Sequence, residues 1–175
     1  TYKTLYSVIK DCNMVIGNMD DTESDLARTL LGTAWSIRSI CYYNLMQRYC
    51  EPYQPETAKE TLGLPLVDDF DMEAKPARAN LKETAEFIEE GFRKALSYNV
   101  SNEDFIFTSS VTKAYFARFF FWTQNWSNAI TYAKEVLEKY PMLEADEYVE
   151  AINQKQAKAH NVIIRSFTMD DDIGT

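Results

Sequence analysis

Glycine and proline are scarce in this 175-residue chain, which has five of each. A sheet protein with many tight turns needs more of both, because these residues supply the backbone angles of turns. The scarcity therefore favours helices. Hydrophobic residues still make up 46% of the sequence, which is typical of a globular chain with a core of its own and not of a disordered one.

Basic side chains and histidine are also few. The chain has 18 Lys and Arg against 27 Asp and Glu, a formal net charge of −9, and His160 is its single histidine. This balance argues against nucleic acid as a partner, because binding it needs a basic surface. Serine and cysteine nucleophiles would need a histidine base, and a zinc site would need clustered histidines and cysteines. The sequence therefore names no catalytic residue, no metal site and no cofactor.

Cysteine occurs an odd number of times, as Cys12, Cys41 and Cys50, so at least one thiol stays unpaired. Cys12 and Cys41 fall on apolar helix faces, where a free thiol behaves as a small hydrophobe. We predict that both are buried and free.

Signal peptide, lipidated-cysteine motif and membrane-spanning run are all missing from the sequence. The chain begins at Thr1 without an initiator methionine, and its apolar residues have helical spacing from the start. We expect it to be a piece of a longer protein, so the missing targeting segment does not indicate a location.

Apolar residues recur at intervals of three and four along most of the chain, which is the period of an amphipathic helix. Asn80 can cap one of these helices, with Glu83 at the capping-box position. The run NVIIRSFTM, residues 161–169, is the one strand-like stretch. We therefore predict an all-α fold with helices at 2–19, 23–50, 80–98, 108–124 and 127–140, and a shorter one at 144–159.

Four large aromatic residues, Phe119 to Trp122, stand side by side. An alternating strand would expose every second ring, and a membrane span would need about 18 or more apolar residues in a row. Polar residues frame the run instead, so we predict a helix that is buried on most of its circumference. A ligand-binding platform is the alternative interpretation of the cluster.

This aromatic helix and the helix after it have the spacing of a tetratricopeptide hairpin, in which a small residue precedes the turn, an aromatic follows it, and alanine and proline come later. Ala117, Trp126, Ala129 and Pro141 fall at those positions, although two other positions depart from the pattern. We predict stacked helical hairpins of this kind, with Trp126 wedged in the last one. The predicted core residues are Trp35, Tyr42, Phe92, Phe116, Phe120, Trp126 and Ala129.

Residues 51–79 form one long irregular insertion that contains four of the five prolines. A loop of this length in a compact domain usually has a function or is disordered. Its candidates for a sugar site are Tyr53 and Phe70, whose rings could stack on a pyranose, and Asp68 and Asp69, which could bind hydroxyl groups. The same residues could instead anchor the insertion to the helices. A calcium loop at DDFD would lack the glycine and spaced oxygens of an EF-hand.

Four stretches share motifs with one protein family in the same order. They are YKTLYSVIKDCNMVIGNMD, LLGTAWSIRSICYYNLMQRYCEPY, GLPLV with Arg78 and the helix from Asn80, and TSSVTKAYFARFFFWTQNWSNAITYAKEVL. The motif positions in the first two are Tyr6, Ile9, Asn13, Gly32, Ala34, Arg38, Tyr42, Leu45, Tyr49 and Pro52. The chain resembles the SusD/RagB-like nutrient-binding lipoproteins of Bacteroidetes over about residues 2–150.

The resemblance implies a tetratricopeptide-like scaffold over 1–160, interrupted by the insertion, and the start of a truncated C-terminal region at 161–175. It also implies a surface-exposed outer-membrane lipoprotein whose lipidated cysteine lies outside this sequence. Such proteins bind glycans, or sometimes peptides, above a SusC-like TonB-dependent transporter. The matching motifs belong to the scaffold, so the resemblance assigns no ligand-binding residue.

Two other functions compete with this interpretation. A glycosidase needs a pair of carboxylates, and the chain has Asp20–Asp21, Asp68–Asp69–Asp71 and Glu89–Glu90. Such pairs are ordinary in an acidic protein, so we expect no enzyme. A tetratricopeptide adaptor would bind a peptide in a concave groove, but its helices would be joined by short regular turns, which the long insertion contradicts.

Overall fold

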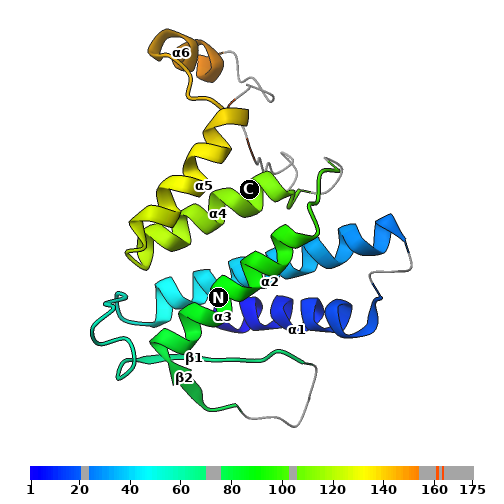
Figure 1. Cartoon of the computed structure of the whole chain (residues 1–175), viewed down its shortest axis with the longest axis vertical. Helices are drawn as coiled ribbons and strands as arrows, with labels where there is room; N and C mark the ends of the chain where they lie inside the picture. Colours follow the sequence, from blue (N-terminus) through cyan, green and yellow to red (C-terminus); the bar gives the residue numbers. More distant parts are fainter. Residues whose placement is uncertain (21–23, 70–75, 103–105, 154–160, 162, 164–175) are drawn as a thin grey trace, which may run out of the picture.

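The computed structural model describes residues 1–20, 24–69, 76–102, 106–153, 161 and 163. The chain is mostly helical, which confirms the predicted all-α fold class (Figure 1). Each bound of the five long helices lies within two residues of its prediction, and α6 starts one residue after the expected position. The described elements are α1 (Tyr2–Asn18), α2 (Asp25–Tyr49), β1 (Leu62–Pro65), β2 (Arg78–Asn80), α3 (Leu81–Ser97), α4 (Ser109–Trp122), α5 (Trp126–Lys139) and α6 (Ala145–Asn153).

Short polar side chains cap the first turns of α2 and α3. The Asn80 side chain accepts a hydrogen bond from the Glu83 N–H, and the Glu83 carboxylate accepts one from the Asn80 N–H. This confirms the predicted capping box. Ser24 caps α2 in the same way by accepting from the Ala27 N–H. Each cap satisfies a backbone donor that the first turn of a helix leaves unpaired. The predicted strand at 161–169 falls almost entirely outside the described residues.

Three helices form a layer in which α1 packs on α2 and α2 packs on α3 (Figure 1). The hairpin of α4 and α5 lies on this layer through contacts of α4 with α3 and α2. Within the described part of the chain, the backbone of α5 packs closely on α4 alone, although Tyr132 of α5 also interacts with Arg93 of α3. The backbone of α6 packs on none of the other described elements. No described element therefore covers the outer side of α5.

The core fills the seam between the layer and the hairpin. Tyr42, Phe92, Phe116 and Phe120 are fully buried, and Ala129 is buried as well. The ring centroid of Phe116 lies 5.1 Å from that of Phe92 and 4.2 Å from that of Phe120. Trp35, in contrast, is half-buried.

The aromatic run from Phe119 to Trp122 is divided between core and solvent. Phe119 and Phe120 are buried, whereas Phe121 is 60% exposed and Trp122 is 48% exposed. Successive side chains of a helix point about 100° apart, and α4 has neighbours on only part of its circumference. The prediction that most of the run is core was therefore wrong for its second half.

The predicted core position of Trp126 was also wrong, because its side chain is 53% exposed. Trp126 begins α5 and forms a T-shaped ring contact with Phe121, with the centroids 5.4 Å apart. In a tetratricopeptide array, the aromatic residue at this position is buried when neighbouring helices enclose the hairpin. Here no described helix covers the outer side of α5.

Cys12 and Cys41 are buried free thiols, as predicted. Burial raises the pKa of Cys12 to about 11 and that of Cys41 to about 12, because desolvation disfavours the thiolate. The nucleophilic form of either thiol is therefore negligible at pH 8. We expect iodoacetamide at pH 8 to leave both unmodified in the folded chain and to alkylate both in urea, as read by mass spectrometry. Native labelling of either one would contradict this packing.

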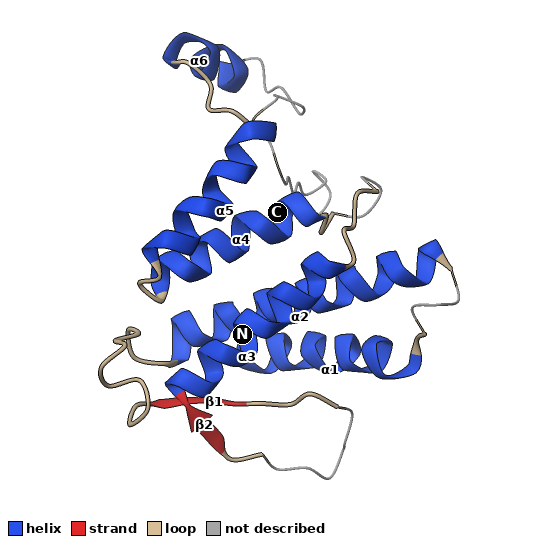
Figure 2. Ribbon diagram, in the orientation of Figure 1, coloured by secondary structure: helices blue, strands red, loops and turns tan. Residues whose placement is uncertain are grey.

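The insertion contains a two-stranded antiparallel ribbon that the sequence analysis did not predict. Leu62 pairs with Asn80 and Pro65 pairs with Arg78, with an irregular register between them. Figure 2 shows the ribbon on the other side of the three-helix layer from the α4–α5 hairpin. Strands of four and three residues are too short to show the alternation that identifies a strand in a sequence.

Candidate functional site

Two tyrosines hold the insertion against the helices. The Tyr42 hydroxyl donates to the carbonyl of Val67 at 3.2 Å and accepts from the Val67 N–H at 2.8 Å. The Tyr6 hydroxyl donates to the carbonyl of Pro65 at 2.8 Å. Burial raises the pKa of Tyr42 to about 12 and raises that of Tyr6 as well. Both hydroxyls therefore stay protonated and able to donate.

Arg38 and Asn13 form a second anchor beside the tyrosines, and both are buried. One Arg38 guanidinium nitrogen donates to the Asn13 side-chain oxygen at 2.8 Å and to the carbonyl of Asp68 at 3.4 Å. The Asn13 amide in turn donates to the carbonyls of Val67 and Asp69, at 2.9 and 3.2 Å. These motif residues bind the backbone of the insertion, so their role in the described structure is to fix its path.

The candidate carboxylates Asp68 and Asp69 have exposed side chains on a backbone that these anchors hold. Their carbonyls, and not their carboxylates, accept the anchoring hydrogen bonds. The fourth candidate, Phe70, lies outside the described residues. The anchoring interpretation of this segment is thus supported for its backbone, while a ligand role for the two carboxylates stays a prediction.

Tyr53 lies at the opposite end of the insertion, just after α2. Its ring packs partly buried against the core, and its carbonyl accepts a hydrogen bond from the Gln124 amide at 3.0 Å. Burial raises the pKa of the Tyr53 hydroxyl, and Glu86 adds to this. Asp68 contacts Arg38, which precedes the end of α2 by eleven residues, or about 16 Å along the helix. The structure therefore does not bring Tyr53 together with Asp68 and Asp69.

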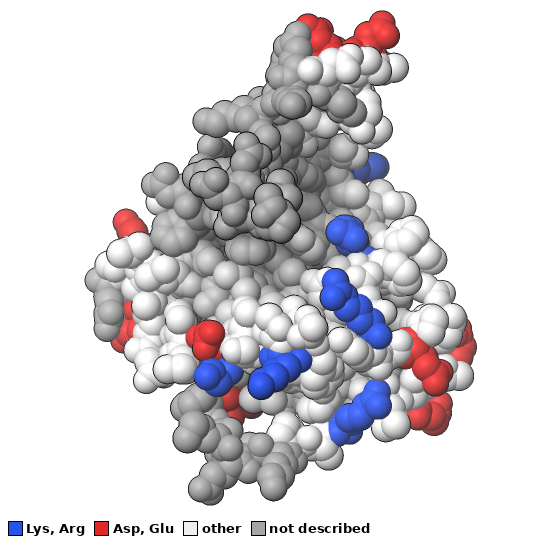
Figure 3. Space-filling model, turned by 180° about the vertical axis from the view of Figure 1, so that it is seen from behind, with Lys and Arg blue, Asp and Glu red and all other residues white. Residues whose placement is uncertain are grey.

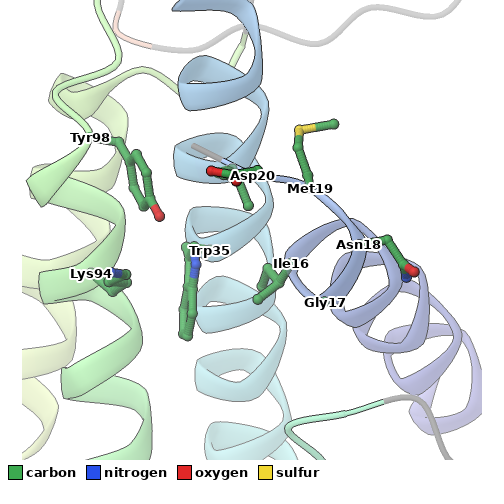
Figure 4. Close-up of a pocket in the computed structure, with 9 residues that line it drawn as sticks. Ile16, Gly17, Asn18, Met19, Asp20, Trp35, Lys94 and Tyr98 are labelled. Atoms are coloured by element: carbon green, nitrogen blue, oxygen red, sulfur yellow. The ribbon is translucent and has the colours of Figure 1, made fainter. Parts of the chain in front are cut away.

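A groove of about 540 Å³ lies between the C-terminal end of α1 and the helices α2 and α3 (Figure 4). Figure 4 shows the nitrogen-bearing edge of Trp35 and the hydroxyl of Tyr98 turned toward this space, below Asp20. One face of each of these two rings, however, already has a cationic side chain over it. The Arg38 guanidinium lies 4.1 Å from the Trp35 centroid, and the Lys94 ammonium lies 5.5 Å from that of Tyr98. The groove thus offers polar groups and ring edges to a small ligand.

A second hollow, of about 660 Å³, lies between the end of α2 and the ribbon. Charged residues of both signs line it, among them Arg48, Glu51, Glu60 and Arg78. Arg78 is already committed to the ribbon, because its guanidinium donates to the carbonyls of Gly63 at 2.6 Å and Leu62 at 3.3 Å. On the face seen in Figure 3, Lys and Arg lie in separate small groups, some of them beside Asp or Glu.

A narrow slot of about 70 Å³ forms where the end of α2 and the start of the insertion meet the C-terminal end of α4. Trp122, Tyr53, Pro52, Gln47 and Glu51 are among its lining residues. The slot includes Tyr53, which the sequence analysis named, and Trp122, which it placed in the core. The aromatic run drew attention to Trp122 in the sequence. The helical period alone, however, does not say which rings of that run face solvent.

Within the described ranges, no group of three or more His, Cys, Asp or Glu residues could hold a metal ion. None of the helices in the described part of the chain is long and apolar enough to cross a membrane.

Stacked helices with an anchored insertion define a tetratricopeptide-like scaffold protein of the kind that the sequence motifs suggested. The family model described as "Starch-binding associating with outer membrane" matches residues 1–121. The chain belongs to this SusD-like family.

Solved structures of other SusD-like proteins share the fold. A SusD superfamily protein from Bacteroides thetaiotaomicron is 20% identical with a TM-score of 0.73, over 86% of this chain and 35% of that one. A SusD-like protein from Bacteroides fragilis is 18% identical with a TM-score of 0.74, over 97% and 34%. A laminarin-binding SusD-like protein is 14% identical with a TM-score of 0.61, over 81% and 30%. The chain thus spans about a third of the length of these proteins. No curated protein matches the sequence.

Proposed function

We propose that the protein binds a glycan at the bacterial cell surface and delivers it to a SusC-like TonB-dependent transporter of the outer membrane. The observation that carries the proposal is membership of a family described as starch-binding and associating with the outer membrane. The structural likeness to a laminarin-binding protein supports a glycan as the ligand. The proposal includes attachment to the membrane through a lipid anchor, which the family resemblance implies.

The proposed role is binding without hydrolysis, and its affinity is modest. A neutral sugar exchanges hydrogen bonds with water for hydrogen bonds with protein, at a net gain of only about 0.5–1.5 kcal/mol each. Burial of the apolar face of a pyranose on an aromatic ring adds to this. A neutral ligand is also compatible with the formal charge of −9, which would repel an anionic one.

An adaptor that binds a peptide in a helical groove is the second candidate. It is favoured by the exposed apolar side chains of Ile130 and Leu137, which lie seven residues apart and hence on one face of α5. A peptide helix could cover such a stripe.

The test is to isolate the full-length protein from the outer membrane and to titrate it with oligosaccharides of starch and laminarin and with a peptide library. We expect a TonB-dependent transporter to co-purify, glycan binding to be weak, and no reducing ends to be released. We expect the 175-residue chain alone to bind more weakly, because it spans about a third of its relatives. Peptide binding without any glycan binding would favour the adaptor, and release of reducing ends would contradict a purely binding role.

A further inference from the structure

Trp122 differs from the other tryptophans in that its indole forms no ring contact or cation–π contact with another described residue. We infer that it is the platform of a sugar subsite, on which one pyranose ring stacks while Gln47 and Glu51 hydrogen-bond its hydroxyl groups. The inference rests on the proposed glycan binding and assigns residues of this chain to it.

The ring of Trp122 is available for stacking. It is 48% exposed, and no ring contact, cation–π contact or side-chain hydrogen bond joins it to any other residue in the described ranges. The guanidinium of Arg38 lies over Trp35, and Phe121 packs against Trp126. Among the tryptophans, Trp122 therefore offers the freest ring to a ligand.

The corner that carries Trp122 is held in place. Gln124 adopts a positive φ of 61°, which is uncommon for a residue other than glycine. Its amide donates to the carbonyl of Tyr53 at 3.0 Å and to the side chain of Gln54 at 3.2 Å. The Asn125 N–H donates to the carbonyl of Phe120, a core residue, at 2.9 Å. A platform fixed in this way loses little conformational freedom on binding, which favours affinity.

Polar groups of the right kind flank the ring. Gln47 and Glu51 line the same slot as Trp122, and neither side chain forms a hydrogen bond or ion pair with another residue of the described chain. An amide donates and accepts, and a carboxylate accepts, so together they can satisfy adjacent hydroxyl groups of a sugar.

The size of the slot determines how the sugar lies. Its volume of about 70 Å³ is far below the roughly 300–1,000 Å³ of an enclosing ligand pocket. A pyranose would therefore lie over the slot on the indole face, with Pro52 and Tyr53 at its side, and would stay largely open to solvent. Such a subsite suits a chain that continues in both directions, as a polysaccharide does.

The experiment compares variants of the full-length protein in calorimetric titrations with starch and laminarin oligosaccharides. We expect Trp122→Ala to weaken binding of the preferred glycan by about tenfold, the loss of one aromatic contact, and Trp122→Phe to restore most of it. Trp126→Ala is the matched control, because this similarly exposed tryptophan lies at the same corner outside the slot. We expect the affinity of this variant to stay within about twofold of the wild type. Gln47→Ala, which leaves the ring intact, should weaken binding by about two- to tenfold.

The outcomes separate this inference from the proposed function. Failure of the wild-type protein to bind any glycan overturns both. Glycan binding that is as tight in Trp122→Ala and Gln47→Ala as in the wild type overturns the subsite alone. An equal loss in Trp126→Ala also overturns it, because the corner would then be an apolar surface that another part of the assembly covers. If Trp122→Ala does not fold, Gln47→Ala alone decides.

Discussion

Replacement of Phe120 by alanine is expected to lower the free energy of unfolding by about 3–5 kcal/mol. The Phe120 side chain is fully buried, and its centroid lies 4.2 Å from that of Phe116, 5.5 Å from Phe119 and 5.8 Å from Tyr132. Alanine removes the transfer free energy of the ring and leaves a cavity in the seam of the hairpin. The packed rings on three sides limit how far the site can collapse.

Phe121→Ala is the matched control for this prediction, because it removes the same ring one residue further on α4. Phe121 is 60% exposed, so we expect a loss below about 1 kcal/mol. Urea unfolding of the 175-residue chain, followed by far-ultraviolet circular dichroism, measures both variants. A small loss for Phe120→Ala, combined with abolished ligand binding in the full-length protein, would favour the platform interpretation of the whole run.

The helices could be predicted because their signals are local. The period of three and four and the Asn80–Glu83 capping box lie within a few residues of one another, and no distant contact is needed to interpret them. The same is not true of the aromatic run. Whether Phe121 and Trp122 face the core depends on which elements surround α4, which its own period does not contain.

The candidate site was harder to predict because its parts lie far apart in the chain. Asn13 bonds to the carbonyl of a residue 54 positions later, and Gln124 bonds to one 71 positions earlier. The motifs marked Asn13 and Arg38 as important but gave no sign that they hold the backbone of the insertion. Of the three insertion candidates that the structure describes, Tyr53 alone lines the slot with Trp122.

Replacement of Gly63 by alanine should destabilise the protein by about 1–3 kcal/mol or more, because a Cβ there would meet the Thr84 hydroxyl and the Asn80 carbonyl well inside van der Waals distance. These atoms cannot retreat freely. The Thr84 hydroxyl accepts from the Leu64 N–H at 3.0 Å and donates to the Asn80 carbonyl at 2.9 Å. The new methyl group therefore pushes the ribbon away from α3 and breaks the contacts that fix it.

Gly17→Ala makes the same chemical change, but we expect it to raise the free energy of unfolding instead of lowering it. Gly17 lies in the last turn of α1 with no atom within 4 Å of an added Cβ, so alanine should raise the unfolding free energy by up to about 0.5–1 kcal/mol through its better helix propensity. Urea unfolding compares the two variants, and hydrogen exchange locates the damage. In Gly63→Ala the Leu64 amide should exchange faster while the amides of α4 keep their relative protection. The added methyl group has no other space, so it can be accommodated only if the ribbon moves away from α3. A Gly63→Ala protein as stable as the wild type, with the Leu64 amide still protected, would therefore contradict the need for this close approach.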